Sequence, residues 1–222
     1  MNKVKMHFSV SYFMLMTLAI FMMALLAYTQ HVESEPSMPS NFQQQPSFKS
    51  ELLQRLSDDL GQYGIEHSMD FSNAVLRFTS GGLHFDSGKV DLPQQQQQIL
   101  KNISLVLEKN LTCYANSQST TQATHCQAPP RDKLQSIVIE GHTDNVPVSA
   151  ATYVKDNTEL SAKRAKAVYK KIVNNTLLGL KNQASEALFT TAAYGDSLPL
   201  NHYSLPTPDE KNRRIDIRFV FL

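Results

Sequence analysis

A buried strand that ends in a charged turn constrains the fold of this chain more than any other feature. Residues 137–139 are three consecutive β-branched residues, and the run continues through Gly141 to His142, Thr143 and Asp144. A pattern of this kind predicts a buried strand stopped by glycine, which delivers the Asp144 carboxylate into the loop at its end.

A helix is predicted to begin soon after that strand. Asn157 or Thr158 is expected to cap it, Glu159 favours its positive first turn, and Arg164 follows one turn after Leu160. A strand end and a helix start that are joined by one loop lie close together. The sequence therefore predicts that a carboxylate, free backbone N–H groups and a guanidinium surround one small space.

Two interpretations of this arrangement remain open from the residue types alone. In the first, the Asp144 carboxylate pairs with a ligand ammonium, while Arg164 and the helix-start N–H groups bind a ligand carboxylate. In the second, Asp144 and Arg164 form an ordinary ion pair that ties the loop to the helix.

Four motifs follow one another in the second half of the chain with a recognisable order and spacing. They are residues 141–144 (Gly-His-Thr-Asp), Asn157 with Leu160-Ser161 and Arg164-Ala165, Tyr194-Gly195-Asp196 with Pro199, and residues 212–215 (Asn-Arg-Arg-Ile). Together they resemble the OmpA-like peptidoglycan-binding domain. The loop that begins at Asp144, with its insertion before Asn157, is most similar to the flagellar motor protein B branch of that family.

The resemblance implies a fold, a ligand and a set of ligand residues. The implied fold is an α/β two-layer sandwich of βαβαβ order, with a mixed sheet and helices on one face. The implied ligand is diaminopimelate of the peptidoglycan stem peptide, held by Asp144 and Arg164. Asn157, Leu160 and Arg213 correspond to family positions that line the same pocket.

A single transmembrane helix is predicted to precede this domain. Residues 8–28 carry no charge, and 21 residues in a helix reach about 31 Å, enough to cross a bilayer core. Lys3 and Lys5 before the run favour a cytoplasmic N-terminus and a periplasmic C-terminal domain, which makes an inner-membrane, single-pass protein. A cleaved signal peptide is the alternative.

The composition of the chain predicts four successive segments. We predict a cytoplasmic stub with an anchor at residues 1–30, a flexible tether rich in proline at 31–47, and a helix and hairpin at 48–80. The OmpA-like domain is predicted at 81–222, where residues 81–88 resemble the strand and turn that open the family domain. Pro93 and the apolar spacing after it predict a helix that begins with the glutamine run.

An insertion with two cysteines interrupts the family pattern. In an oxidising periplasm, Cys113 and Cys126 are predicted to form a disulfide, and two free thiols are the alternative.

The sequence argues against several functional classes. The formal charge is +1, without a basic patch for nucleic acid. His142 and Asp144 lack a third metal ligand at a recognised spacing, and no nucleophile motif is present. We therefore expect neither an enzyme nor a cofactor or metal.

Two non-catalytic functions fit these features. The chain could anchor an inner-membrane protein to peptidoglycan, or serve as a stator-like, force-transmitting subunit beside a polytopic membrane partner. Stator subunits of the family carry an aspartate in their membrane helix, but Tyr12, Phe13 and Met14 stand near its counterpart here, so we expect no ion relay. A homodimer is compatible with the resemblance.

Overall fold

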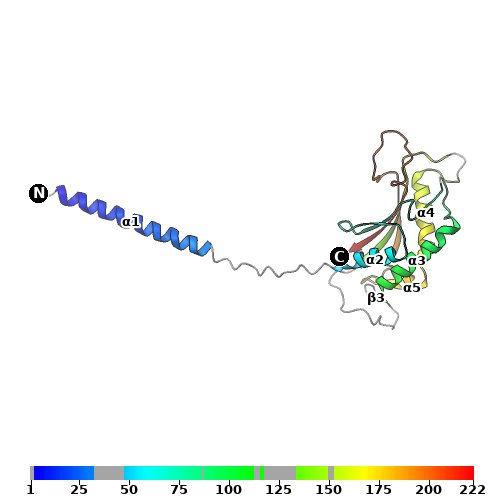
Figure 1. Ribbon diagram of the computed structural model, residues 1–222, viewed down its shortest axis with the longest axis horizontal. Helices are drawn as coiled ribbons and strands as arrows, with labels where there is room; N and C mark the ends of the chain where they lie inside the picture. The colour runs from blue at the N-terminus through cyan, green and yellow to red at the C-terminus, as the bar shows by residue number, and fades with distance from the viewer. Residues whose placement is uncertain (1–2, 33–47, 87, 113–115, 118–133, 150–152) are drawn as a thin grey trace. The chain divides into compact units, whose positions relative to one another are not determined.

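The computed structural model describes residues 3–32, 48–86, 88–112, 116–117, 134–149 and 153–222 (Figure 1). The chain divides into two units, Met1–Gln45 and Pro46–Leu222. The predicted tether falls almost entirely on residues 33–47, which lie outside the described residues, as do Cys113 and Cys126.

Helix α1 (Lys3–Val32) is the described part of the first unit. It includes the residues that were predicted to cross a membrane. Within the described residues, however, no helix combines the length and the hydropathy that a membrane crossing requires. The predicted transmembrane helix at residues 8–28 is therefore not supported.

A mixed five-stranded sheet forms the centre of the second unit. Its order is β1-β2-β7-β4-β6, and the parallel pair is β4 with β6, while the other neighbours run antiparallel. The strands are β1 (Ser68–Asp70), β2 (Val75–Phe78), β4 (Leu134–His142), β6 (Phe189–Gly195) and β7 (Ile215–Phe221). This sheet confirms the predicted α/β class with mixed strand directions.

The helices of the second unit pack on one face of this sheet (Figure 1). They are α2 (Phe48–Gln62), α3 (Gln94–Leu111), α4 (Asn157–Ile172) and the short α5 (Asn175–Leu178). A small ladder pairs β3 (Asn116–Ser117) with β5 (Leu180–Lys181). The apolar faces of the helices meet Ile137 and Ile139 of β4 and Ile215, Ile217 and Phe219 of β7 in one buried core.

Strand alternation gives the opposite face of the sheet a different character. Because successive side chains of a strand point to opposite faces, Glu140 and His142 of β4 lie away from the helices, as do Asp216 and Arg218 of β7. Glu140, His142 and Asp216 are nevertheless buried.

The first strands differ in detail from the sequence-based expectation. The hairpin predicted within residues 48–80 is formed by β1 and β2, and because β2 pairs with the closing strand β7, the hairpin is part of the domain's sheet. Residues 81–88 were predicted to open the domain with a strand, but residues 81–83 lie after β2 in a turn, and the described residues up to 88 form no strand. Phe85 within this segment is buried in the core.

Candidate functional site

The end of β4 is held closely against α4 and the neighbouring strands. Gly141 lies so close to the backbone of Ser161 that a Cβ atom at this position would overlap the Ser161 carbonyl. The His142 N–H donates to the Arg214 carbonyl at 3.1 Å, and the Thr143 N–H donates to the Gly195 carbonyl at 2.8 Å. These contacts fix the direction in which the chain leaves the sheet toward Asp144.

The Asp144 carboxylate is buried and paired, but not with Arg164. Its Oδ2 atom accepts from Nη1 of Arg213 at 2.7 Å and from the Asp209 N–H at 3.2 Å. Its Oδ1 atom receives only a long contact of 3.4 Å from the Val146 N–H. The ion pair between Asp144 and Arg164 that was predicted as the alternative to a ligand site is not found among the described residues, because Asp144 pairs with Arg213.

At the start of α4, the residue that caps the helix differs from the sequence-based prediction, and Asn157 has another role. The N-cap is Asp156, whose side chain accepts from the Glu159 N–H at 2.8 Å, and not Asn157 or Thr158. Asn157 instead donates from Nδ2 to the carbonyls of Asp144 and Val146, at 3.2 and 3.0 Å. Its side chain therefore braces the loop that carries Asp144.

Arg164 is a buried cation. Its side chain donates from Nε to the Lys89 carbonyl at 2.9 Å and from Nη2 to the Asp86 carbonyl at 3.0 Å. Its guanidinium also lies over the Phe85 ring, 4.9 Å from the centroid. Among the described residues, no carboxylate forms an ion pair with Arg164, although only 3% of the residue is exposed.

The electrostatic surroundings of Arg164 reflect this lack of a partner. Burial and the positive charge of Arg213 lower the pKa of Arg164 to about 10, and the charge of Asp144 only partly opposes them. Arg164 still carries its charge at neutral pH. A buried charge without a counter-charge is costly, and an anionic ligand would relieve that cost.

A narrow pocket opens beside this guanidinium. It encloses about 240 Å³ of space, part of it open to solvent, and its walls are Ser80, His84, Phe85, His142, Arg164, Arg213 and Arg214. In its present shape it has room for about one water molecule. A larger group would enter only after a wall side chain moved, and the most exposed of the three arginine side chains is Arg213, at 24%.

The five predicted ligand residues lie in one region of the structure. Arg164 and Arg213 line the pocket, and Asp144 adjoins it through its ion pair with Arg213. Asn157 and Leu160 lie at the start of α4, where Asn157 supports the Asp144 loop and Leu160 is buried.

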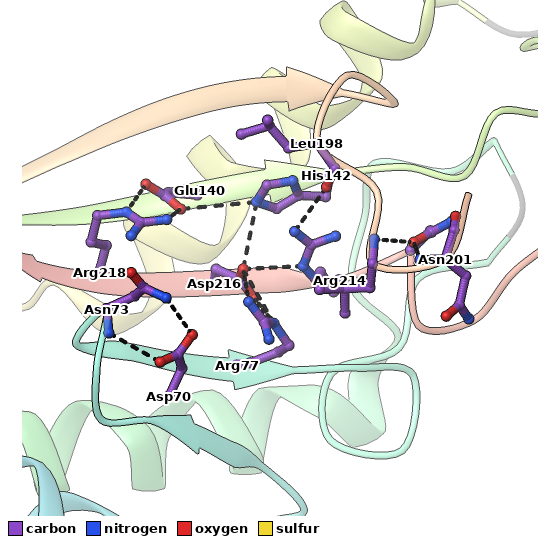
Figure 2. A network of polar contacts seen from close by, with 12 residues as sticks. Asp70, Asn73, Arg77, Glu140, His142, Leu198, Asn201, Arg214, Asp216 and Arg218 are labelled. Atoms are coloured by element: carbon purple, nitrogen blue, oxygen red, sulfur yellow. Dashed lines mark hydrogen bonds and ion pairs between the residues drawn. The ribbon is translucent and has the colours of Figure 1, made fainter. Parts of the chain in front are cut away.

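A network of charges beside the pocket was not predicted from the sequence. Figure 2 shows Asp216 between Arg77 and Arg214, and Glu140 facing Arg218. Each of these carboxylates accepts two hydrogen bonds or more from the arginines. The alternation of Glu140 with His142, and of Arg214 with Asp216, is the sequence signal that could have revealed it.

Glu140, His142 and Asp216 are close enough to one another to suggest a metal site. Three arginines, however, already bind the two carboxylates, so the cluster carries a formal charge of about +1 before any cation enters. Nε2 of His142 lies 3.9 Å from Glu140 and 3.7 Å from Asp216, beyond hydrogen-bond distance. We interpret the cluster as a buried ion-pair network.

The loop between β6 and β7 completes the region. Asp209 accepts from Asn201 and Tyr203 side chains and from the backbone N–H groups of Lys211 and Asn212. Burial alone would raise the pKa of Asp209, but these hydrogen bonds outweigh it and lower the pKa to about 2. The loop that positions Arg213 is thus tied down by a charged residue.

Comparisons with known proteins agree with this architecture. The OmpA family model matches residues 111–213. Motility protein B of Bacillus subtilis (strain 168) is 26% identical over 169 residues, which cover 76% of this chain and 53% of the relative. The chain therefore spans about half the length of this curated relative.

Solved structures resemble the same part of the chain. A putative MotB-like protein from Desulfovibrio vulgaris covers 76% of this chain and 88% of its own, with 22% identity and a TM-score of 0.51. The cell wall anchor of the T6SS from Pseudomonas aeruginosa covers 76% and 96%, with 21% identity and a TM-score of 0.48. The likeness to the first of these supports the fold. The resemblance to the OmpA family model thus extends over residues 111–213, a little under half of the chain.

Proposed function

We propose that this domain binds peptidoglycan without catalysis, through the zwitterionic end of diaminopimelate in the stem peptide. The observation that carries the proposal is the buried guanidinium of Arg164, which lines a pocket and has no carboxylate partner among the described residues. A carboxylate of the ligand would supply that partner through charge-assisted hydrogen bonds.

Asp144 offers the complementary group. Its Oδ2 atom is occupied by Arg213, but its Oδ1 atom has only one long contact and can accept from a ligand ammonium. Because the pocket is narrow, we propose that Arg213 moves aside when the ligand enters. Asn157 and Leu160 then contribute by holding the loop and the helix start in place.

By this proposal the chain attaches itself to the cell wall from the periplasm, the compartment in which peptidoglycan lies. A second candidate, favoured by the likeness to Motility protein B, is a subunit of a force-transmitting complex that is fixed to the wall by the same pocket. Co-purification of a polytopic membrane protein with the full-length chain would support this second function, and its absence from a native membrane extract would count against it.

Sedimentation with purified sacculi tests wall binding. Wild-type protein is expected to pellet with sacculi, whereas Asp144→Ala and Arg164→Ala should remain in the supernatant with unchanged circular dichroism. Lys163→Ala is the matched control, because it removes a positive charge from the same helix at a side chain that pairs with Glu159 at the surface. Co-sedimentation of both pocket variants at the wild-type level would refute the assigned site.

A further inference from the structure

Buried polar side-chain atoms without a hydrogen-bond partner gather at one place in the described part of the chain. They belong to His142, Thr143 and Arg214, and two of these residues, His142 and Arg214, line the pocket. Such atoms are rare in folded proteins, so a cluster of them calls for a group that could satisfy them.

Arg214 is the member of this cluster whose unpartnered atom belongs to a charged group. It stands just before β7, and only 6% of the residue is exposed. Its Nε atom donates to Asp216 at 3.0 Å and its Nη2 atom to the Leu198 carbonyl at 3.1 Å (Figure 2). Its Nη1 atom is buried and has no hydrogen-bond partner in the part of the chain that the structure describes.

The unpartnered atoms of His142 and Thr143 point to a ligand less directly. Nε2 of His142 is directed at Glu140 and Asp216, at 3.9 and 3.7 Å, which are negative charges and not the pocket. Thr143 is not one of the residues that line the pocket in the described structure. Nδ1 of His142 is also without a partner among the described residues, but Arg214 is the charged residue whose unused donor and pocket position point to an anionic ligand.

The charges at the pocket indicate which kind of ligand it takes. Three guanidinium groups line it, and Asp144 neutralises that of Arg213. The Asp216 carboxylate is shared between Arg214 and Arg77, so it does not fully balance either of them. Arg164 has no carboxylate partner at all among the described residues, and the pocket is therefore left with an excess of positive charge.

We propose that Nη1 of Arg214 donates to the same ligand carboxylate that Arg164 binds, so that two guanidinium groups hold it. This inference rests on the proposed function and deepens it. It defines the substrate class as stem peptides whose diaminopimelate carboxylate is free, and it disfavours peptides in which that carboxylate is amidated. An amide carries no charge and presents its own donors to the two guanidinium groups.

A cycle of variants and ligands tests this pairing in the full-length chain. Calorimetric titration would use a stem tripeptide that ends in diaminopimelate, with its side-chain carboxylate either free or amidated. Amidation is expected to weaken binding to wild type at least tenfold. The amidation penalty is the factor by which the free peptide binds more tightly than the amidated one. In Arg214→Gln this factor should shrink by about tenfold, because one of the two guanidinium groups that donate to the carboxylate is gone.

Arg77→Gln is the matched control. Arg77 shares the Asp216 carboxylate with Arg214 but is not among the residues that line the pocket. A purely structural role for the network would weaken both peptides equally in both variants. The inference predicts that Arg77→Gln keeps the full amidation penalty.

The outcomes separate this inference from the proposed function. If wild type binds neither peptide, the proposed function fails. If wild type prefers the free carboxylate and Arg214→Gln keeps the same preference, only the role of Arg214 is overturned, as it would be if Nη1 merely held a water molecule. If Arg214→Gln does not fold, Arg214→Lys replaces it in the same cycle, because lysine keeps the charge but lacks the second terminal nitrogen that the guanidinium provides.

Discussion

Replacing Arg164 by methionine should separate binding from stability. The substitution keeps much of the length of the side chain and its contact with Phe85, but it removes a charge for which the described residues offer no carboxylate partner. It also removes two hydrogen bonds to the carbonyls of Asp86 and Lys89, which water can replace because both residues are exposed. We expect binding to be weakened while folding is little affected.

The magnitudes follow from these contacts. Hydrogen bonds to a charged group contribute about 1.5–3 kcal/mol, so loss of the ligand carboxylate's partner should weaken binding roughly 10- to 150-fold. Two effects of the substitution on folding oppose each other. The lost hydrogen bonds destabilise the fold, whereas removal of a buried charge relieves a desolvation cost of several kcal/mol. The free energy of unfolding should therefore change by no more than about 1–2 kcal/mol.

Arg218→Met provides the contrast. Arg218 forms two hydrogen bonds with Glu140, whose residue is 1% exposed, so this variant leaves a buried carboxylate without its arginine. Breaking a buried pair in this way typically costs about 3–5 kcal/mol. Urea denaturation followed by circular dichroism measures both variants. The reasoning is refuted if Arg164→Met loses as much stability as Arg218→Met, or if it binds sacculi like wild type.

Three further predictions concern the loop, the core and the cysteines. Gly141→Ala should destabilise the fold by about 1–3 kcal/mol, because its Cβ would overlap backbone, whereas Gly61→Ala meets nothing within 4 Å and should not destabilise; denaturant midpoints compare the two. Because the pKa of Asp209 is lowered to about 2 in the folded state, its stabilisation is present above about pH 4 and is lost as the pH falls toward 2. The melting temperature should consequently fall more steeply over this range in wild type than in Asp209→Asn, and parallel curves would argue against it. Thiol labelling should find Cys113 and Cys126 unreactive until the protein is reduced.

The central strand and helix of the site could be predicted from sequence because their signals are local. The β-branched run before Gly141 and the apolar spacing around Leu160 specify a strand and a helix, and a single loop between them brings Asp144 close to Arg164. The helix start was predicted within two residues of its position. Its cap was wrong because Asp156, Asn157 and Thr158 are three consecutive residues that can all cap a helix.

The pairing of Asp144 could not be predicted in the same way. Its partner Arg213 lies 69 residues away, after an irregular loop without hydrophobic periodicity, so no local pattern places it. The sequence showed two adjacent arginines and gave no reason to separate their roles. The structure shows that Arg213 pairs with Asp144, while Arg214 is buried against Asp216.

The buried charges on the far face of the sheet were accessible to sequence reasoning in principle. Glu140 and His142 alternate with core residues of β4, and Asp216 and Arg218 do so in β7. A sheet covered by helices on one face leaves its other face for such residues. Alternation does not reveal that these charged residues are buried by pairing with one another, on a face that no described helix of the second unit covers.

Titration of the full-length chain with two stem tripeptides tests the central claim most directly. One peptide ends in diaminopimelate, and the other has lysine in its place, which keeps the side-chain ammonium and lacks the carboxylate. The account predicts that the diaminopimelate peptide binds and that the lysine peptide binds at least tenfold more weakly. Equal affinity for the two peptides, or binding of neither, would contradict it.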